Sequence, residues 1–354
     1  MTFLINPRMP VSNGLAPLAD RHGRHLSSLR LSVIDRCDLR CRYCMPEKDY
    51  TWLPRQQLLS VNQFAALAAA FAELGVSRLR LTGGEPLLRD DLPALVQQLS
   101  GIPGIGDLAM TTNGTRLAAG AAELRDAGLQ RVTVSLDSLR RDRFRQLTRS
   151  DRLEQVVHGL ETASAAGFQS VKINTVVIRD FNDDELVQML EFARQLGAEL
   201  RFIEYMDVGG ATQWTHRQVV SRSQILARLR QHYGRILTEP RKDTAPADRF
   251  RLPDGTLFGV IASVTEPFCR QCDRSRLTAD GLWYLCLYAN EGLNLQRILS
   301  EGGPEAVMET VAQTWTERLE RGAEERLQHP ERGSLFQIQE LKRDPHREMH
   351  TRGG

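Results

Sequence analysis

Six cysteines are the residues of this 354-residue sequence best suited to chemistry, and they form two groups of three near opposite ends of the chain. The first cysteine group is Cys37, Cys41 and Cys44, and the second cysteine group is Cys269, Cys272 and Cys286. An odd number in each group disfavours disulfides closed within a group, and closely spaced thiols indicate a metal site instead. Structural zinc takes four protein ligands. Neither group has a fourth cysteine or a nearby histidine to complete such a set.

An iron–sulfur cubane suits three cysteines, because three thiolates hold it and leave one of its four irons open to a small molecule. The Cys-x3-Cys-x2-Cys spacing of the first cysteine group therefore predicts an iron–sulfur cluster. Spacing alone leaves the second group open between a second cluster and a zinc ion completed by a distant residue. The dipeptide Asp280-Gly281 predicts a hairpin that would place Cys286 opposite about Ser275 and close to Cys272. That hairpin favours a preassembled cluster or metal site.

Alternating strands and helices must position the first cysteine group. Strands are predicted at 29–34, 78–82, 107–112, 131–136, 170–177 and 199–205, with helical stretches between them. This alternation predicts a parallel sheet with right-handed crossovers. Six units in about 180 residues fall short of the ~250 residues and eight units of a closed barrel. We therefore expect an α/β fold built on an incomplete six-stranded (β/α)6 TIM-like barrel, with a doubly wound open sheet as the alternative.

Polar or glycine-rich residues lie at the end of each predicted strand, at 35–44, 83–86, 111–114, 135–137, 172–174 and 204–206. In parallel α/β folds, ligands bind at the carboxyl ends of the strands. The sequence therefore predicts one site at this edge of the sheet, next to the first cysteine group.

The pattern changes beyond about residue 210. A helix is predicted at 217–233, a loop or linker at 240–254, a strand at 257–263, and hairpin strands at 274–278 and 282–288. We expect an N-terminal extension (1–28), the partial barrel (29–210), and a smaller β-rich C-terminal domain (211–354) that carries the second cysteine group and caps the barrel.

Composition excludes several classes of function. The formal net charge is +2, too small for whole-surface attraction to nucleic acid or anionic lipid, and no helix-turn-helix or basic stripe is evident. The longest apolar stretch, 64–72, is far shorter than the roughly 18 residues of a membrane-spanning helix. The first ten residues contain proline and arginine where a signal peptide needs an apolar core. We expect a cytoplasmic protein with no nucleic-acid or membrane partner.

The first cysteine group, with Tyr43 inside it and Gly83-Gly84-Glu85-Pro86 after the next strand, resembles the cluster loop of radical S-adenosylmethionine (SAM) enzymes. Within that superfamily the chain resembles the GTP 3′,8-cyclases of molybdenum-cofactor biosynthesis, from about Leu18 to the last residue. The similar segments are 29–46, 78–90, 111–114, 134–139, 171–174, 201–206 and 268–288. The Cys-x2-Cys-x13-Cys spacing of the second group separates this family from most other radical SAM enzymes.

The resemblance implies two [4Fe-4S] clusters, one on each cysteine group. The open iron of the first cluster would bind SAM, whose reductive cleavage gives a 5′-deoxyadenosyl radical. The residues implied to contact SAM are Tyr43, Gly84, Glu85, Ser135 and Met206, although Met206 could also be core filler. The second cluster would bind the guanine of GTP. The radical would remove the ribose C3′ hydrogen and C3′ would bond to C8, giving a 3′,8-cyclo-7,8-dihydro nucleotide.

The triphosphate of GTP carries about four negative charges, so the barrel mouth needs cations, preferably guanidiniums. By resemblance, the residues expected to bind GTP are Arg30, Arg80, Thr111, Lys172, Arg274, Ser275 and Arg276, with Arg78 and Arg201 as second choices. Lys172 is the more telling, because only four of the 46 basic residues are lysines and a lone arginine means little here. Arg274 and Arg276 alternate along one predicted strand and should point the same way.

The chain ends in Gly353-Gly354, a terminus typical of the same family. Two glycines can thread a narrow opening, and the terminal carboxylate could then hold an arginine in place. We therefore count Arg274, Arg276, Gly353 and Gly354 as the expected catalytic residues. Arg352 departs from the family, where an apolar residue is expected, so the docking of the tail could differ.

The resemblance further implies a homodimer, an electron donor such as flavodoxin or ferredoxin, and cyclic pyranopterin monophosphate synthase as the next enzyme. Two other functions compete with the cyclase. One is a radical SAM enzyme that modifies a peptide, which would usually carry more C-terminal cysteines. The other is an iron–sulfur sensor that binds nucleic acid, which the net charge of +2 disfavours.

Overall fold

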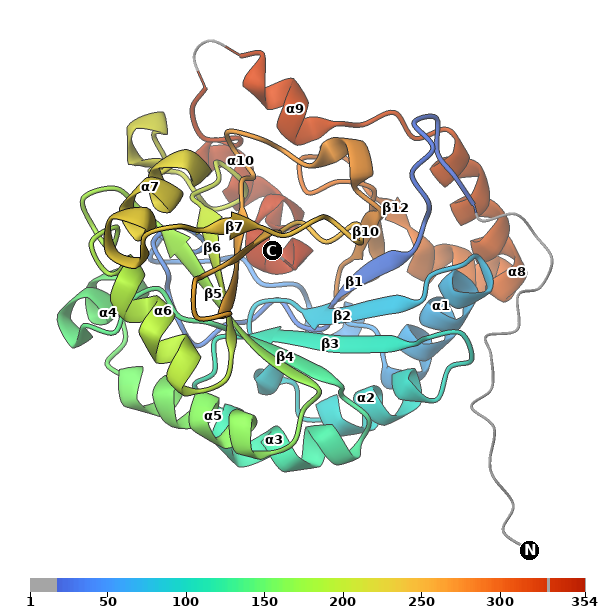
Figure 1. Cartoon of the computed structure of the whole chain (residues 1–354). Helices are drawn as coiled ribbons and strands as arrows, with labels where there is room; N and C mark the ends of the chain where they lie inside the picture. The colour runs from blue at the N-terminus through green and yellow to red at the C-terminus, as the bar shows by residue number, and fades with distance from the viewer. Residues whose placement is uncertain (1–17, 330–331, 354) are drawn as a thin grey trace, which may run out of the picture.

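A curved sheet forms the centre of the computed structural model, which describes residues 18–329 and 332–353 (Figure 1). Its strand order is β12-β11-β10-β1-β2-β3-β4-β5-β6-β9-β8-β7. The parallel strands are β10 (Arg274–Leu277), β1 (Ser28–Ser32), β2 (Arg78–Thr82), β3 (Asp107–Thr112), β4 (Arg131–Ser135), β5 (Ser170–Val177), β6 (Glu199–Glu204) and β9 (Leu257–Ile261). The antiparallel edge strands are β11 (Leu282–Tyr284), β12 (Leu293–Asn294), β8 (Asp248–Arg251) and β7 (Leu237–Thr238).

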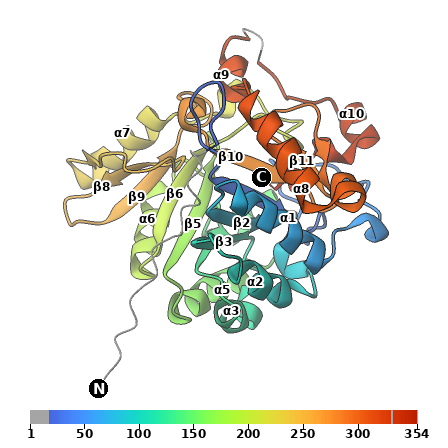
Figure 2. The ribbon, with the colours of Figure 1, turned by 90° about the vertical axis from the view of Figure 1, so that its right-hand side faces the viewer.

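Helices cover the outer face of the sheet (Figures 1 and 2). They include α1 (Val61–Glu73), α2 (Leu92–Ser100), α3 (Leu117–Asp126), α4 (Arg141–Thr148), α5 (Leu153–Ala165), α6 (Leu186–Gln195), α7 (Arg222–Tyr233) and α8 (Leu295–Thr316). Helix α1 begins where expected, because Ser60 and Gln63 form a reciprocal capping box. Among the helices described, none combines the length and apolarity needed to cross a membrane.

Strand alternation separates the core from the cavity. On β1 and β2 the leucines Leu29, Leu31, Leu79 and Leu81 are fully buried and join the core that the helices cover. The intervening residues face the other side of the sheet, as the period of two requires. The arginines among them therefore point inward rather than into the core.

The α/β class is confirmed, and all six predicted strands are present with ends shifted by no more than two residues. Two expectations were wrong. The segment 240–254, expected as a loop or linker, contains β8, which pairs antiparallel with β9. The second hairpin strand ends at Tyr284 instead of 288. The sheet also extends further than predicted, because β10 and β9 from the C-terminal part continue it in parallel on both sides. The predicted division at about residue 210 stays a prediction.

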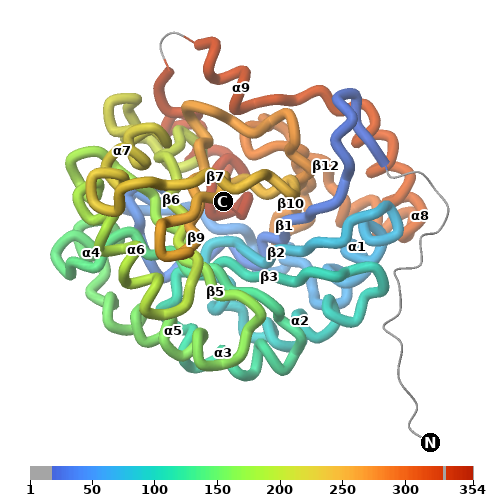
Figure 3. The backbone as a smooth tube through the Cα atoms, viewed as in Figure 1, coloured from blue at the N-terminus to red at the C-terminus, as the bar shows by residue number. Residues whose placement is uncertain are grey.

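The last turns of the chain run into the space that the sheet surrounds (Figure 3). Helices α9 (Gly322–Leu327) and α10 (Ile338–Arg343) are followed by the short α11 (Met349–Arg352). Short 3₁₀ turns include η2 (Pro86–Leu88), η3 (His216–Gln218) and η4 (Cys269–Gln271). Helix α7 was expected from residue 217 but begins at Arg222, because Ser221 caps it.

Candidate active site

A cavity of about 840 Å³ occupies the inside of the curved sheet, and both cysteine groups line it. The first cysteine group lies at the carboxyl ends of the strands, together with Gly84, Ser135 and Met206. The second cysteine group lies beside β10, together with Arg274 and Arg276. The structure thus brings the two groups, about 230 residues apart in the sequence, to one cavity.

The loop of the first cysteine group packs backbone to backbone against the turn after β2. The Gly84 amide donates to Ile34 O at 2.8 Å, and the Glu85 amide donates to Arg36 O at 2.8 Å. A Cβ on Gly84 would lie 2.2 Å from Arg36 O, a distance that real Cβ atoms do not show. Only glycine fits here, so the Gly-Gly-Glu-Pro motif fixes the path of the cysteine loop.

Glu85 supports this loop from behind the cavity wall. Its carboxylate accepts from Thr112 Oγ1 at 2.6 Å, from the Asn113 amide at 2.7 Å and from the Leu87 amide at 3.0 Å. The side chain is fully buried and does not line the cavity. The carboxylate oxygens thus have partners on β3, in the turn after it and on η2, and the expected contact of Glu85 with SAM stays a prediction.

Asn113 reaches the cysteines instead and was missed as a site residue. Its Nδ2 donates to Asp38 Oδ1 at 2.7 Å and lies 3.8 Å from Cys37 Sγ. The motif Thr-Thr-Asn-Gly was noted in the sequence, but only Thr111 was selected from it. The Glu85–Asn113 hydrogen bond explains why the two motifs occur together.

Burial and carboxylates raise the thiol pKa values of the first cysteine group. Burial raises the pKa of Cys37 to about 12, with Glu85 adding to the shift. Burial likewise raises the pKa of Cys41 and Cys44 well above the usual value. Thiolates at this position need a strong cationic partner, which the irons of a cluster provide.

Tyr43 sits on the same wall of the cavity. Its hydroxyl donates to Asp137 Oδ2 at 2.8 Å, and Asp137 Oδ1 accepts from the Val176 amide at 2.7 Å. Burial raises the pKa of Asp137 to about 6. Strands β4 and β5 therefore fix the tyrosine ring next to Cys41 and Cys44. Met206 lines the cavity and also packs against buried apolar residues, and its expected contact with SAM stays a prediction.

The second cysteine group is assembled by the turn before β10 and by the chain after β11. Cys269 and Cys272 bracket η4, and Cys286 follows β11. The register pairs Arg276 with Tyr284 and Leu277 with Trp283. Continued outward, it sets Cys286 opposite Arg274, one residue away from the expected Ser275.

The thiols of the second cysteine group lie among guanidinium groups. Burial alone would raise the pKa of Cys272, but Arg274 and Arg318 outweigh it and lower the pKa to about 7. Burial raises the pKa of Cys269 to about 11, against the opposing charge of Arg24. A thiolate at Cys272 is thus available near neutral pH.

Each cysteine group supplies three thiols to the cavity wall. Within residues 18–329 and 332–353, no three Cys, His, Asp or Glu side chains converge on a point where they could hold one metal ion. A cubane spreads its thiolates over separate irons, and three thiols at each end of the cavity match that requirement.

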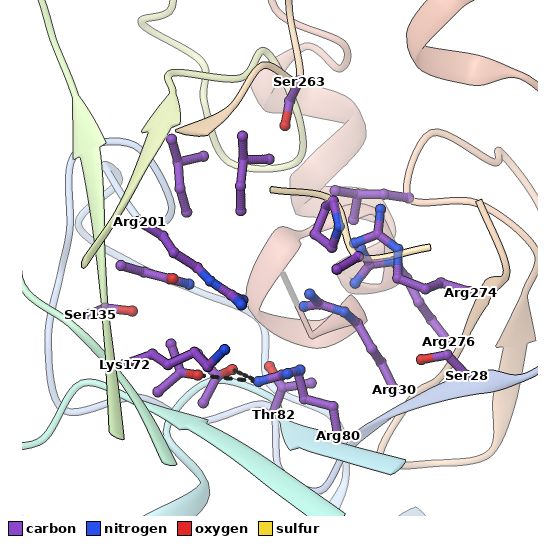
Figure 4. Close-up of a pocket in the computed structure, with 18 of the residues that line it drawn as sticks. Ser28, Arg30, Arg80, Thr82, Ser135, Lys172, Arg201, Ser263, Arg274 and Arg276 are labelled. Atoms are coloured by element: carbon purple, nitrogen blue, oxygen red, sulfur yellow. Dashed lines mark hydrogen bonds between the residues drawn. The ribbon is translucent and has the colours of Figure 1, made fainter. Parts of the chain in front are cut away.

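Arginines form a row across three neighbouring strands. Arg276 on β10 is in register with Arg30 on β1, which is in register with Arg80 on β2. Figure 4 shows these three and Arg274 pointing into the cavity. Burial and the neighbouring arginines lower the pKa of Arg276 to about 10 and that of Arg30 well below its usual value. A bound polyanion would relieve this mutual repulsion.

A second cationic cluster faces the row from β5 and β6. Lys172 Nζ lies 3.4 Å from both carboxylate oxygens of Glu199, and Arg201 Nε lies 2.8 Å from Oε1. Burial, followed by Arg201, lowers the pKa of Lys172 to about 8. Between the two sets, Arg80 Nη1 lies 3.4 Å from Thr111 Oγ1 (Figure 4). Arg78 also lines the cavity and is paired with Asp273.

Ser275 does not join these residues. It is fully buried and absent from the cavity wall, because alternation on β10 directs Arg274 and Arg276 inward and the residue between them outward. The expectation that Ser275 belongs to the GTP site stays a prediction. Arg274 is held over the Phe268 ring, with Cζ 4.5 Å from the ring centroid.

The C-terminal tail ends at the arginine row. Gly353 O accepts from Arg276 Nη1 at 2.5 Å and from Arg30 Nη1 at 3.4 Å. Gly353 has φ +69°, and a Cβ there would lie 2.4 Å from Thr82 Cγ2, so the position requires glycine. Gly354 and its carboxylate lie outside the described residues.

Arg352 secures the tail in a way that the sequence did not predict. Its guanidinium is buried and donates to His346 O at 2.5 Å, Leu287 O at 3.0 Å and Ala289 O at 2.6 Å. It also stacks on Tyr284, with Cζ 4.4 Å from the ring centroid. Hydrogen bonds to carbonyls thus replace the apolar contact expected at this position.

Two family models and several curated relatives match most of this chain. Residues 31–193 match the family model "Radical SAM superfamily", and residues 198–324 match "Molybdenum Cofactor Synthesis C". The chain is 53% identical over 344 residues to GTP 3′,8-cyclase 3 of Mycobacterium bovis, covering 96% of this chain and 91% of the relative. It is 52% identical to GTP 3′,8-cyclase 1 of Mycobacterium tuberculosis, covering 98% of each chain.

Solved structures show the same fold at low identity. SuiB of Streptococcus suis bound to S-adenosylmethionine has a TM-score of 0.59 at 14% identity, covering 87% of this chain and 69% of that chain. SuiB bound to its precursor peptide has a TM-score of 0.61 at 13% identity, with the same coverage. This likeness concerns the fold alone.

Proposed function

The chain belongs to the GTP 3′,8-cyclase family of radical SAM enzymes, and we propose that its cavity binds SAM at the end lined by the first cysteine group and GTP at the end lined by the arginine row. The enzyme is a lyase that converts GTP to (8S)-3′,8-cyclo-7,8-dihydroguanosine 5′-triphosphate, the first step of molybdenum-cofactor biosynthesis. Its cofactors are two [4Fe-4S] clusters and SAM. The first cluster would pass an electron to SAM to give the 5′-deoxyadenosyl radical that removes the C3′ hydrogen of GTP, and the second cluster would bind the guanine.

At the SAM end, Cys37, Cys41 and Cys44 hold the first cluster. Tyr43 is fixed by Asp137 and presents its ring to the adenine. Gly84 offers bare backbone, while Ser135 and Met206 complete the wall. Glu85 acts through Asn113 and the cysteine loop, as a positioning residue.

At the GTP end, Cys269, Cys272 and Cys286 hold the second cluster, whose open iron faces the guanine. Arg30, Arg80 and Lys172 bind the triphosphate with Thr111, and Arg201 lies close enough to assist. Forked guanidiniums suit phosphate oxygens, and burial together with the neighbouring positive charges lowers the pKa values of Arg80 and Arg276.

Arg274 and Arg276 are the residues we assign to catalysis, with Gly353 holding Arg276 in place and Gly354 included by resemblance to the family. The Gly353 carbonyl binds Arg276 and Arg30 together, so the tail sets the direction of two guanidiniums at once. Arg276 would then contact the reacting nucleotide from a fixed position.

The observation that supports this assignment best is the register Arg276–Arg30–Arg80 beside the second cysteine group. The test is anaerobic reconstitution followed by incubation with SAM, dithionite and GTP. We expect GTP consumption and 5′-deoxyadenosine release together, and we expect neither when ATP replaces GTP. Release of 5′-deoxyadenosine without loss of GTP would contradict the proposal and would favour a peptide substrate.

We also propose a cytoplasmic homodimer that receives electrons from flavodoxin or ferredoxin and passes its product to cyclic pyranopterin monophosphate synthase. The six cysteines are free thiols, in keeping with a reducing compartment. Sedimentation of the reconstituted protein and reduction of its clusters by purified flavodoxin would test the first two points. A monomer, or clusters that flavodoxin leaves oxidised, would contradict them.

A further inference from the structure

Three charged residues that do not line the substrate cavity lie directly behind the second cysteine group. Asp20 and Arg24 come from the segment before β1, and Arg318 follows helix α8. Their side chains are 0%, 2% and 1% exposed. Asp20 Oδ2 accepts from Arg24 Nε at 2.5 Å and lies 3.8 Å from Arg318 Nη1. Charged side chains are almost never buried to this degree unless they are paired with another group.

Both arginines bind the backbone that carries the cysteines. Arg24 Nη1 donates to Cys269 O at 3.0 Å, and Arg318 Nη1 donates to Cys272 O at 3.1 Å. The two cysteines at the ends of the η4 turn are therefore each held by one guanidinium.

The three residues are themselves rigidly placed. Asp20 Oδ1 accepts from the amides of His22 and Arg24 at 2.9 Å each. Trp315 Nε1 donates to Arg24 O at 3.0 Å, and Arg318 Cζ stacks 4.4 Å from the Trp315 ring centroid. The N-terminal segment and the end of α8 thus meet at the second cysteine group, although almost 300 residues separate them.

The charges of this triad do not balance. Two guanidiniums share one carboxylate, which leaves one buried positive charge. Arg24 Nη2 and Arg318 Nε also have no hydrogen-bond partner among the described residues. Neutral side chains could hold two carbonyls without the cost of burying an extra charge. The excess charge is explained if its partner is the negative charge of the three thiolates and their cluster.

We propose that Asp20, Arg24 and Arg318 are positioning residues of the second cluster, which fix the cysteine turn and raise the reduction potential of that cluster. The inference rests on the cluster assignment above. A buried positive charge stabilises the reduced cluster, which is the more negative state, and net charge and hydrogen bonding are the means by which proteins set cluster potentials. The carboxylate of Asp20 reduces this effect.

The test uses two near-isosteric variants whose effects have opposite signs. Arg318→Gln keeps a donor for Cys272 O but removes the charge, and Asp20→Asn removes the negative charge. The protein is reconstituted at full length in the Cys37→Ala, Cys41→Ala, Cys44→Ala background, so that the second cluster alone gives the EPR signal. We expect a redox titration to move the potential of Arg318→Gln to more negative values and that of Asp20→Asn to more positive values. Arg318→Lys should return it toward the original value.

Shifts of the same sign in both variants, or no shift in either, would overturn the proposal and leave a structural role. If a variant lost iron, the potential of the Arg24→Gln variant and of the Arg318→Lys variant would decide the question. Arg143→Met is the matched control. This variant removes from helix α4 an arginine that is paired with Glu185, and it should leave the potential of the second cluster unchanged. If the unmodified background binds no cluster at all, the cluster assignment itself fails, which is a distinct result.

Discussion

The two cysteine groups line one cavity but lie in opposite electrostatic surroundings. Carboxylates surround the first group: Glu85, Asp38, Asp137 and Glu348 all raise the pKa of its thiols, after burial. Guanidiniums surround the second group, where Arg24, Arg274, Arg276 and Arg318 act in the other direction. SAM carries a sulfonium and an ammonium, whereas GTP carries a triphosphate. The charge of each end therefore matches one ligand and disfavours the other.

Removing the first cysteine group should have the largest effect, because it should abolish the function of the SAM end of the cavity and leave the second cluster in place. We expect the reconstituted protein to bind about eight irons per chain, and the Cys37→Ala, Cys41→Ala, Cys44→Ala variant about four. SAM cleavage should be abolished, because no iron remains to bind SAM. Iron analysis and 5′-deoxyadenosine assays measure both. One zinc in place of the second cluster would refute our interpretation of the second cysteine group.

Truncating the tail should abolish cyclisation of GTP while both clusters and SAM stay bound in the cavity. Deletion of Gly353 and Gly354 removes the carbonyl that binds Arg276 and Arg30. We expect both clusters and SAM binding to persist and GTP turnover to be lost. Gly353→Ala should act in the same direction, because its Cβ would meet Thr82 Cγ2.

Gly197→Ala is the matched control for that variant. Gly197 also has positive φ, but a Cβ there meets nothing within 4 Å. It should lose some stability and no specific turnover. A truncated enzyme with the turnover rate of the full-length enzyme would show that the tail has no catalytic role.

Single arginine variants should weaken the GTP end alone. Arg274→Ala and Arg276→Ala each remove a charge-assisted contact, which costs about 1.5–3 kcal/mol, or roughly 10- to 150-fold in GTP affinity. Equilibrium binding of GTP to the cluster-loaded protein measures this loss. Arg270→Ala, in the η4 turn before β10 and exposed, is the control, and this variant should bind GTP as the parent does. Unchanged affinity in both test variants would place the phosphate site elsewhere.

The smallest effect should be a pH dependence from Lys172. Its pKa of about 8 means that it is charged below that pH and neutral above it. GTP affinity should therefore fall as pH rises through about 8, by no more than about tenfold. Lys172→Arg keeps its charge and should remove this step from the pH profile. An identical profile in the variant would assign the step to another group.

Local patterns predicted much of this structure. The parallel strands could be predicted because strand and helical stretches alternate along the sequence, and the first cluster site could be predicted because the spacing of its cysteines is a local pattern. β8 was missed because its neighbourhood is rich in proline, aspartate and arginine and its pairing with β9 is visible only in the fold.

The surroundings of individual site residues could not be predicted from the sequence either. Only the structure shows that the Glu85 carboxylate accepts hydrogen bonds from Thr112 and Asn113, and that the Ser275 side chain faces away from the cavity. The Asp20–Arg24–Arg318 triad joins segments that are almost 300 residues apart in the sequence, so no local sequence pattern predicts it.

We propose that SAM and GTP meet in one cavity. The radical formed at the first cysteine group would then reach the ribose of the GTP whose triphosphate the arginine row binds. The most direct test is turnover of GTP labelled with deuterium at C3′, followed by mass spectrometry of the 5′-deoxyadenosine released. We predict one deuterium in the 5′-deoxyadenosine for each cyclised nucleotide. Unlabelled 5′-deoxyadenosine formed alongside cyclised product would contradict the claim.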